Sequence, residues 1–498
     1  MQVFLHLLKI CKFSFLDLSS PLIQSFAPFM IFSSPLFIFY FLPIVFFLYY
    51  VFYKSIYVQN AILLLSSLIF YFWGEKEYTI IVIISTLLNY GIGQLLNLVN
   101  RDKLKSFVLL SGVGINLAIL CYFKYYNFII NEILVRLSLA QPLPETSLIH
   151  LPLGISFFTF HGLTYIIDIY RKNAFVAKSP LNAGLYTLFF PQLIAGPIVR
   201  YKDIAHQLIH REISSDKLYV GVKRFIIGLS KKLLLANVLG KMADDIYLLP
   251  LEHQSSVLSW LAIICYSMQI YFDFSGYSDM AIGLAKLFGF DFLENFNLPY
   301  IATSIRDFWR RWHISLTNFF RDYLYIPLGG NRQSKLRTNI NLMLVFFCTG
   351  LWHGASWNFI LWGLWHGLFL LIERSRFGQI LDNSTKIVKH AYVLVIVTIG
   401  WVFFRHSHLT DIQFQLKKLF LIDRSFSGVY PINYFLSWSF IITFIIAIVL
   451  CTSLSIKSKT VSPIFFKYGN TVFYLVLFFL CLMSLSNSTY NPFIYYRF

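Results

Sequence analysis

Apolar stretches about as long as a membrane is thick follow one another along most of the chain. A helix needs about 20 mostly apolar residues to cross a hydrocarbon core of about 30 Å. Of the 498 residues, 57% are apolar and only 13% are charged, whereas an average soluble domain carries about 25% charged residues. This composition excludes a disordered chain, a fibrous chain and a soluble enzyme with a solvated surface. We therefore expect an all-α polytopic membrane protein.

The apolar windows predict about 11 to 13 transmembrane helices. Two windows, 183–199 and 276–290, are too short or too often interrupted by glycine and proline to be simple spans. Because irregular backbone at membrane depth is tolerated only where protein covers it, we expect both to be re-entrant. The windows lie at 34–53, 58–73, 78–98, 107–123, 150–169, 183–199, 218–239, 256–274, 276–290, 340–351, 355–373, 390–405, 434–454 and 470–487.

The formal net charge of +18 comes from lysines and arginines that lie between the apolar runs. This placement favours cytoplasmic loops and anionic lipid head groups over a nucleic-acid partner. Basic residues are dense in 99–106 and 171–178, which we expect on the cytoplasmic side, whereas 124–149 is expected to face outward. The chain is predicted to be a multi-pass protein of the cell membrane.

The first 29 residues differ from the rest of the chain. Lys9, Lys12 and Asp17 interrupt their apolar part, and no small-residue cleavage site of a signal peptide is evident. Met30 opens a natural first span. We expect residues 1–29 to be either an upstream extension or the product of a start codon assigned too early, and residues 30–498 to form a single transmembrane domain.

Histidines in the apolar stretches are candidate functional residues, because ionisable groups inside membrane spans are costly and usually functional. His353 stands between apolar and aromatic residues, with Trp352, Gly354 and Trp357 beside it. Tryptophan walls lower the local dielectric, and a neutral imidazole is the state that a general base needs. The alternative for a histidine in a span is a hydrogen bond between helices.

The same pattern argues against a metal centre. His366 follows thirteen residues after His353, and no carboxylate occurs before Glu373, which does not match the ligand spacing of a zinc site. We expect no metal. The chain has no nucleophile elbow, phosphate-binding loop or dinucleotide fingerprint in a credible context, which argues against serine hydrolase, NTPase and dinucleotide chemistry.

A basic run from Arg306 to Arg337 includes Arg310 and Arg311. It is typical of an interfacial helix whose cations reach lipid head groups, and equally of a mouth that holds the phosphates of a donor such as coenzyme A. The two interpretations are compatible. Asp273 and Asp279 lie in an apolar setting, where carboxylates must pair or stay protonated. We expect them to pair with this basic run.

Taken together, the motifs resemble the membrane-bound O-acyltransferase (MBOAT) family, in its bacterial alginate O-acetyltransferase branch. The resemblance covers roughly residues 30–490. It is carried by FYFWGEKEY, GISFFTFHGLTYIIDIYR, FFPQLIAGPIVRY, FDFSGYSDMAIGLAKLFGF, FWRRWHISLTNFFRDYLYIPLGGNR and LWHGASWNFILWGLWHG. One departure is His161, where this branch would have glutamine.

The resemblance implies a ring of transmembrane helices around a thin centre, reached by a cytoplasmic tunnel and an outer funnel. It implies that His353 is the catalytic histidine and His313 the second active-site residue, and it leaves the role of His366 open. Both side chains should then line one cavity, within about 10 Å of each other. Arg306, Arg310, Arg311, Trp352 and Trp357 are the expected substrate-binding residues.

The implied reaction takes an acyl group, such as acetyl from acetyl-coenzyme A, to hydroxyls of a cell-surface polysaccharide. The donor is a substrate, and no tightly bound cofactor is expected. His353 would take the hydroxyl proton, while His313 or backbone N–H groups would steady the oxyanion. A separate periplasmic or extracellular acyltransferase often completes the transfer in this branch. A D-alanyl transferase and an acyl transporter without base catalysis are the alternatives.

Overall fold

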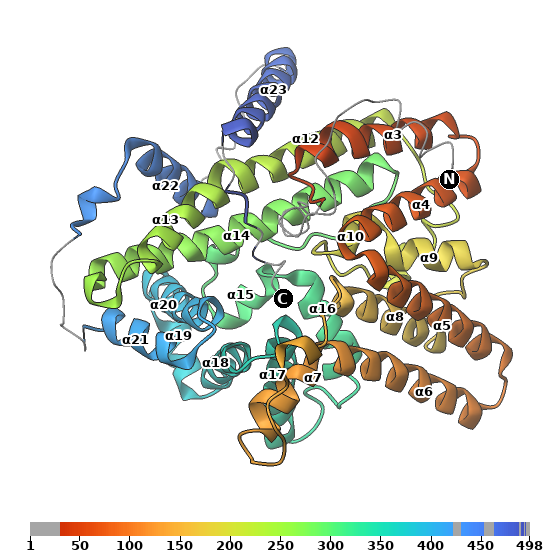
Figure 1. The fold of residues 1–498 in the computed structure, drawn as a ribbon, viewed down its shortest axis with the longest axis horizontal. Coiled ribbons are helices and arrows are strands. Elements are labelled where there is room, and N and C mark those ends of the chain that lie inside the picture. Colours follow the sequence, from red (N-terminus) through yellow and green to blue (C-terminus); the bar gives the residue numbers. More distant parts are fainter. Residues whose placement is uncertain (1–29, 422–429, 453–462, 488–489, 493, 495–498) are drawn as a thin grey trace.

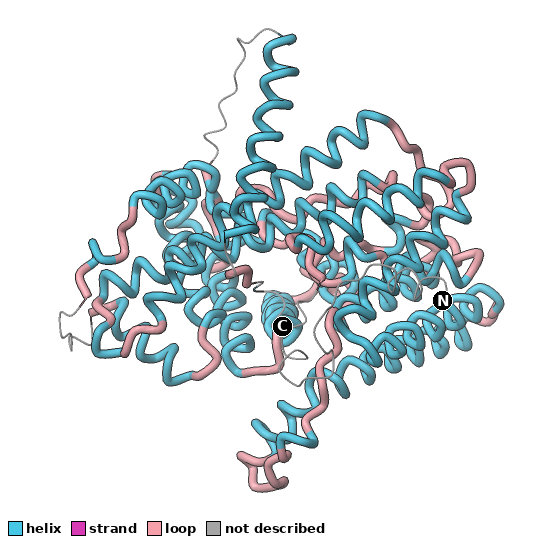
Figure 2. Tube along the Cα trace, turned by 45° about the horizontal axis from the view of Figure 1, so that its top comes forward, coloured by secondary structure: helices cyan, strands magenta, loops and turns pink. Residues whose placement is uncertain are grey.

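The computed structural model describes residues 30–421, 430–452, 463–487, 490–492 and 494. In these ranges the chain consists of helices and connecting loops, without a strand (Figure 2). Residues 1–29, expected to be an extension or the product of an early start, lie outside the described residues. That 30–498 form a single domain stays a prediction.

The first half of the chain is a succession of α-helices with short 3₁₀ and π segments between them. They are η1 (Phe37–Phe41), α3 (Leu42–Val51), α4 (Ile56–Glu75), η2 (Lys76–Tyr78), α5 (Thr79–Leu98), α6 (Asp102–Leu120), η3 (Cys121–Tyr125), α7 (Tyr126–Phe128), η4 (Ile129–Leu134), η5 (Glu145–Ser147), α8 (Ile155–Tyr170), α9 (Pro180–Leu188), α10 (Phe190–Leu193), α11 (Tyr201–Ile204), α12 (Ser215–Ser230), η6 (Lys231–Ala236), α13 (Asn237–Tyr247) and η7 (Leu251–His253).

The second half begins with a helix of 32 residues, α14 (Ser256–Leu287). It continues with η8 (Pro299–Ile301), α15 (Ile305–Arg311), α16 (Ile314–Phe320), η9 (Arg321–Tyr325), α17 (Lys335–His353), α18 (Trp357–Glu373), α19 (Arg376–Asn383), α20 (Lys386–Arg405), α21 (Leu409–Leu419), η10 (Ile432–Tyr434), α22 (Trp438–Cys451) and α23 (Pro463–Asn487). The short helices α15 and α16 lie in the middle of the molecule with longer helices around them, and α23 projects from the body (Figure 1).

Four helical stretches of described residues are long and apolar enough to cross a membrane: Ile56–Leu98, Asp102–Leu134, Ser256–Leu287 and Lys386–Arg405. Three shorter apolar helices are Phe37–Val51, Trp438–Cys451 and Thr471–Asn487. These helices confirm the expected all-α polytopic membrane protein. The count of about 11 to 13 spans stays a prediction.

The two windows expected to be re-entrant differ in outcome. Residues 183–199 are divided between α9, the four-residue α10 and an irregular segment, all buried inside the protein, as irregular backbone at membrane depth requires. The prediction for 276–290 was wrong, because residues up to Leu287 continue α14 without a break.

The glycines of that window serve close packing of α12 against α14. A Cβ on Gly276 would lie 2.7 Å from the carbonyl oxygen of Gly228, and one on Gly283 would lie 2.7 Å from that of Gly221. Glycines seven residues apart on each helix therefore let the two backbones touch. Small residues at such contacts are typical of helix pairs in membranes.

The carboxylates of α14 pair with cations of α12 and η6. Asp279 lies 2.7 Å from Lys231 and from Arg224, and Asp273 lies 2.8 Å from Lys232 with both side chains almost fully buried. The expectation that they pair with the run from Arg306 to Arg337 was therefore wrong. Because α12 and η6 both pack along α14, their cations lie beside these carboxylates.

The C-terminal residues that the structure describes return to this buried pair. The backbone N–H of Ile494 donates to Asp273 at 2.9 Å, and Lys232 donates to the carbonyl of Pro492. The hydroxyl of Tyr490 donates to Asp244 of α13 at 2.6 Å. The chain end thus contributes to the same core as α12 and α14.

Candidate active site

His353 is the last residue of α17. Its ring is 1% exposed and is enclosed by the rings of Trp352 at 4.9 Å, Trp362 at 4.9 Å and Phe404 at 5.2 Å between centroids. The helix ends here because the chain turns at once into α18, and a Cβ on Gly354 would overlap the ring of Phe359. The α17–α18 turn therefore places the imidazole in an aromatic interior.

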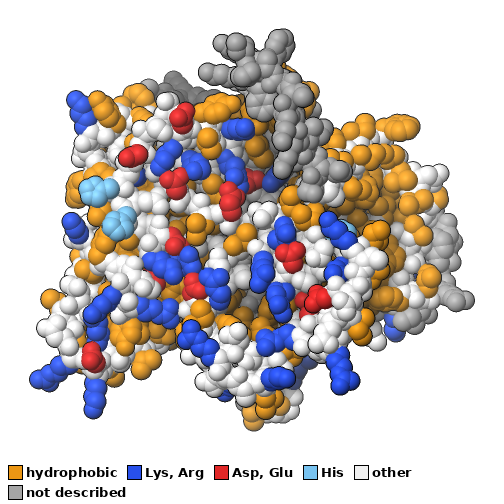
Figure 3. All heavy atoms as spheres, turned by 180° about the vertical axis from the view of Figure 1, so that it is seen from behind, with side chains coloured by type: hydrophobic (Ala, Val, Ile, Leu, Met, Phe, Trp, Pro, Cys, Tyr) orange, Lys and Arg blue, Asp and Glu red, His pale blue; other side chains and the backbone are white. Residues whose placement is uncertain are grey.

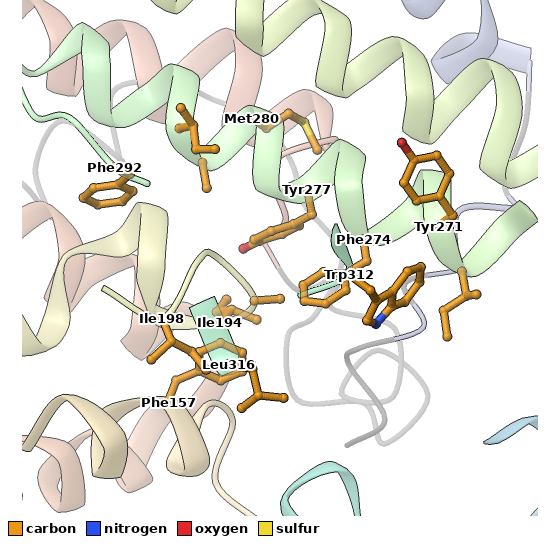
Figure 4. Packing of buried hydrophobic residues seen from close by; sticks show 14 of the residues in the cluster. Phe157, Ile194, Ile198, Tyr271, Phe274, Tyr277, Met280, Phe292, Trp312 and Leu316 are labelled. Atoms are coloured by element: carbon orange, nitrogen blue, oxygen red, sulfur yellow. The ribbon is translucent and has the colours of Figure 1, made fainter. Parts of the chain in front are cut away.

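His313 lies between α15 and α16 with a left-handed backbone, φ 44° and ψ 53°. This conformation is unfavourable for a residue with a side chain, and such strain gathers at functional sites. The ring is fully buried, with Phe274 of α14 at 4.7 Å and Trp352 at 5.7 Å between centroids. Phe274 and Trp312 lie close to each other among the buried side chains of Figure 4.

The rings of His313 and His353 lie 6.4 Å apart, centroid to centroid, although 40 positions separate them in the chain. The structure thus brings together the two histidines that the sequence motifs singled out, well inside the expected separation of about 10 Å. Their catalytic roles stay a prediction.

A polar cluster contacts the far side of the His313 ring. Nδ1 lies 3.1 Å from Oδ1 of Asn295, and the same oxygen accepts hydrogen bonds from the hydroxyl of Ser315 at 2.9 Å and its backbone N–H at 3.2 Å. Nδ2 of Asn295 donates to the hydroxyl of Ser278 on α14 at 3.1 Å. Sequence reasoning missed Asn295, because nothing local in its loop links it to residue 313.

Lys124 in η3 was also missed. Its buried ammonium donates to the carbonyl oxygen of Trp352 and to the hydroxyl of Ser156 at 3.0 Å. The neighbouring Tyr125 donates its hydroxyl to the carbonyl of Leu351 at 2.9 Å. Cations and other donors stabilise the last carbonyls of a helix. The sequence signal was a lysine directly after the apolar window 107–123.

Of the two tryptophans expected at the site, only Trp352 contacts both histidine rings. Trp357 packs instead against Phe128, with ring centroids 5.5 Å apart. Trp362 lies in the second turn of α18 and packs against the ring of His353. The turn between α17 and α18 brings the two side chains together. The sequence did not single out Trp362.

His366 lies one layer away from the pair. Its buried ring contacts Trp309 and Trp362, each at 5.2 Å between centroids, and stacks on Phe308 at 6.2 Å. His161 is fully buried in α8 against Tyr186. Neither ring contact involves His353 or His313.

The expected basic substrate-binding residues lie on α15, which leads directly into His313. Arg306 and Arg310 are exposed, while Arg311 pairs with Asp307 at 2.9 Å and donates to the carbonyl of Asn297 at 3.2 Å. Their role in binding a donor stays a prediction.

The loop after α14 borders a cavity of about 280 Å³. Asn295 and Ser278 line it, and so do the cations Arg224 and Lys231 with their partner Asp279. Because Asn295 contacts His313, the cavity reaches one side chain away from the histidine pair. Among the described residues, no group of three or more His, Cys, Asp and Glu side chains is arranged to hold a metal ion.

Comparison with known proteins identifies the family of the chain. Residues 171–407 match the model of the membrane-bound O-acyltransferase family. The chain is 42% identical to the probable alginate O-acetylase AlgI of Pseudomonas aeruginosa over 384 residues, which is 76% of this chain and 73% of that protein.

Two other relatives act, by their names, on cell-wall polymers. A peptidoglycan O-acetyltransferase of Helicobacter pylori is 36% identical over 78% of this chain and 80% of its own length. A teichoic acid D-alanyltransferase of Bacillus subtilis is 34% identical over 44% of this chain and 58% of its own length. Because relatives that are 36% to 42% identical match more than three quarters of its length, the chain belongs to the membrane-bound O-acyltransferase family and is a multi-pass O-acyltransferase.

Proposed function

We propose that this O-acyltransferase moves an acetyl group from a cytoplasmic thioester to a hydroxyl of a cell-surface polysaccharide. The observation that carries the proposal is the pair of buried imidazoles 6.4 Å apart, His313 and His353. Relatives named for O-acetyl transfer to alginate and to peptidoglycan match more than three quarters of the chain, which supports acetyl as the group.

In the proposed reaction the hydroxyl oxygen attacks the thioester carbonyl carbon while His353 accepts the hydroxyl proton. The C–S bond then breaks, the C–O bond remains, and the departing sulfur takes up the proton. Positioned general bases contribute about 10²–10⁴ in rate. The aromatic walls exclude water, so that the thioester is not hydrolysed before the acceptor arrives.

We assign the donor role to acetyl-coenzyme A, bound as a substrate. Arg306, Arg310 and Arg311 would hold its phosphates, because guanidinium groups match phosphate geometry. The cavity that Asn295 lines would admit the thioester arm next to the residue that contacts His313.

We place the enzyme in the bacterial plasma or inner membrane. Figure 3 shows lysine and arginine side chains spread over one broad face, with fewer acidic ones among them. By the excess of cations in cytoplasmic loops, this face is assigned to the cytoplasm. A periplasmic or extracellular acyltransferase would then receive the acyl group on the opposite side and complete the transfer to the polysaccharide.

Transfer of D-alanine from a carrier protein is the second candidate. The match to a D-alanyltransferase favours it, although that match covers only 44% of the chain. Such an enzyme would use the same histidines and would need a docking surface for the carrier beside the donor route.

An assay with each labelled donor supplied separately distinguishes acetyl transfer from D-alanyl transfer. Inverted membrane vesicles from producing cells would receive labelled acetyl-coenzyme A or a labelled D-alanyl carrier protein, and label in the polysaccharide fraction would be counted. Vesicles that contain His353→Ala are the control. We expect acetyl label that the control lacks. Label from the D-alanyl carrier alone, or equal acetyl label in both vesicle types, would overturn the proposal.

A further inference from the structure

We propose that Asn295 is a positioning residue of the acyl-transfer centre, which holds His313 in the tautomer whose Nε2 offers a lone pair to the reacting groups. The inference rests on the proposed function and assigns which nitrogen of one of its histidines accepts a hydrogen bond. It follows from four hydrogen bonds around one amide.

The orientation of the Asn295 amide is settled by its neighbours. The backbone N–H of Ser315 points at one end of the amide at 3.2 Å, and an N–H can only donate. That end must therefore be the carbonyl oxygen, Oδ1. The NH₂ end then faces the hydroxyl of Ser278 at 3.1 Å, which accepts from it.

The tautomer of His313 follows from this orientation. Its Nδ1 lies 3.1 Å from the same Oδ1, which accepts and cannot donate. Nδ1 must therefore carry the hydrogen, and in a neutral imidazole the other nitrogen, Nε2, is then the acceptor. Nε2 is buried and has no hydrogen-bond partner among the described residues.

The backbone around His313 is fixed from the same loop. The N–H of Ile314 donates to the carbonyl of Asn295 at 2.9 Å, and the N–H of Asn297 donates to the carbonyl of Arg311 at 2.9 Å. These two bonds join the loop after α14 to the turn that contains the left-handed residue. The N–H of Ile198, from the irregular segment after α10, donates to Ser315 at 3.0 Å and closes the cluster.

The assignment changes the role that the family resemblance implies for His313. An Nε2 without hydrogen cannot donate a hydrogen bond to the oxyanion. Of the two expected donors, His313 and backbone N–H groups, only the backbone N–H groups can then stabilise the oxyanion. His313 instead accepts a hydrogen bond from the acceptor hydroxyl before His353 takes up the proton of that hydroxyl. A residue that fixes a catalytic tautomer in this way, when replaced in another enzyme class, costs about 10⁴ in kcat.

The test compares three variants of the full-length protein in lipid vesicles. Asn295→Leu keeps the approximate volume and removes the acceptor, whereas Asn295→Asp keeps an acceptor oxygen at the same place. Asn116→Leu is the matched control, since Asn116 is a buried asparagine that is hydrogen-bonded to Asn89 between α5 and α6, away from the histidines.

We expect Asn295→Leu to lower kcat about 10²-fold or more without a comparable rise in donor KM. Asn295→Asp should recover most of the rate and move the acid limb of the pH–rate profile to higher pH, because a carboxylate stabilises the imidazolium of His313. Asn116→Leu should lower the thermal midpoint by a similar amount as Asn295→Leu while keeping kcat within about threefold. Equal kcat losses in the two leucine variants would overturn the proposal.

A second measurement does not depend on turnover. In ¹⁵N-histidine-labelled protein, the His313 signals are assigned by their loss in His313→Gln. We expect a protonated Nδ1 and an unprotonated Nε2 in the parent, and a mixture of tautomers in Asn295→Leu. A protonated Nε2 in the parent would overturn the proposal even if acyl transfer is confirmed. Absence of acyl transfer with the expected tautomer would instead contradict only the proposed function.

Discussion

The ammonium of Lys124 donates a hydrogen bond to the carbonyl oxygen of Trp352, a residue 228 positions further along the chain. This contact joins η3 to the C-terminal end of α17, one residue before His353. Lys124 therefore provides the hydrogen-bond donor for the buried carbonyl of Trp352 at the end of α17. This helix end positions His353, the proposed base.

Replacement of Lys124 by methionine should slow turnover without removing any reacting group. A displacement of about 1 Å at a catalytic group costs up to about 10²-fold in rate, and we expect a fall in kcat of about tenfold or more. The variant Tyr125→Phe, which removes the neighbouring hydrogen bond to Leu351, should lose less. A Lys124→Met enzyme with parental kcat would contradict a positioning role.

His353→Ala should abolish transfer while membrane insertion and expression stay close to normal. Loss of a general base costs about 10²–10⁴ in rate, whereas the loss of one buried imidazole costs about 1–3 kcal/mol of stability. Acetyl release from acetyl-coenzyme A and the thermal midpoint would be measured together, with His366→Ala as the control. A folded His353→Ala protein that keeps more than about a tenth of the turnover would leave His313 as the better candidate.

The triple variant Arg306→Gln/Arg310→Gln/Arg311→Gln should raise the donor KM more than it lowers kcat. Charges that hold remote phosphates bind ground state and transition state alike. Each charge-assisted hydrogen bond contributes about 1.5–3 kcal/mol, so we expect a KM increase of about tenfold or more. Steady-state kinetics with acetyl-coenzyme A measure the effect, and equal losses in kcat and kcat/KM would place the arginines in the chemistry instead.

The buried pair Lys232–Asp273 offers a test of stability. Lys232→Met leaves a buried carboxylate without its cation, which should cost about 3–5 kcal/mol. The double variant Lys232→Met/Asp273→Leu removes both charges and should regain most of the thermal midpoint, because an apolar pair of similar size is often neutral or stabilising. A double variant as unstable as the single one would show that the C-terminal contacts of Asp273 matter more than the ion pair.

We expect the ion pairs of Asp322 to make the stability of the folded protein depend on pH. Burial raises the pKa of this carboxyl, but the cations of Arg321, Lys202 and Arg200 outweigh burial and hold the pKa below its ordinary value. Its contribution is therefore present above the unfolded pKa of about 3.9 and is lost as the pH falls through the folded value.

Asp322→Asn should lower the thermal midpoint at pH 7 and flatten its fall below about pH 4, measured by thermal unfolding in detergent across pH. Glu145→Gln makes the same charge change on an exposed side chain and should leave the acid slope as it is. An Asp322→Asn protein with the parental slope would contradict the assignment.

The two histidines could be singled out from the sequence because each sits in a contiguous motif that resembles one of the membrane-bound O-acyltransferase family. Asn295, Lys124 and Trp362 could not, since each reaches the site through a turn or a helix contact between distant segments. A lysine directly after an apolar window indicates that its ammonium needs a partner, but only the packing shows that this partner is a helix end.

The errors about α14 have a related cause. Its glycines are the usual sign of a broken span, whereas the structure uses Gly276 and Gly283 as contact points for α12. That same contact brings Lys231 and Lys232 to the α14 carboxylates. The apolar stretches therefore predicted the helices, whereas the packing of α12 against α14 determined where the charges pair.

The hydrogen bond from Ile494 to Asp273 also concerns how the protein is made. During synthesis, α12 and α14 leave the ribosome more than 200 residues before Ile494 does, so they must wait in the translocation machinery or the bilayer with a carboxylate that lacks one of its final donors. The surroundings of Asp273 are therefore complete only after translation has passed Ile494. A stop codon before Ile494 acts at this closing step of biogenesis.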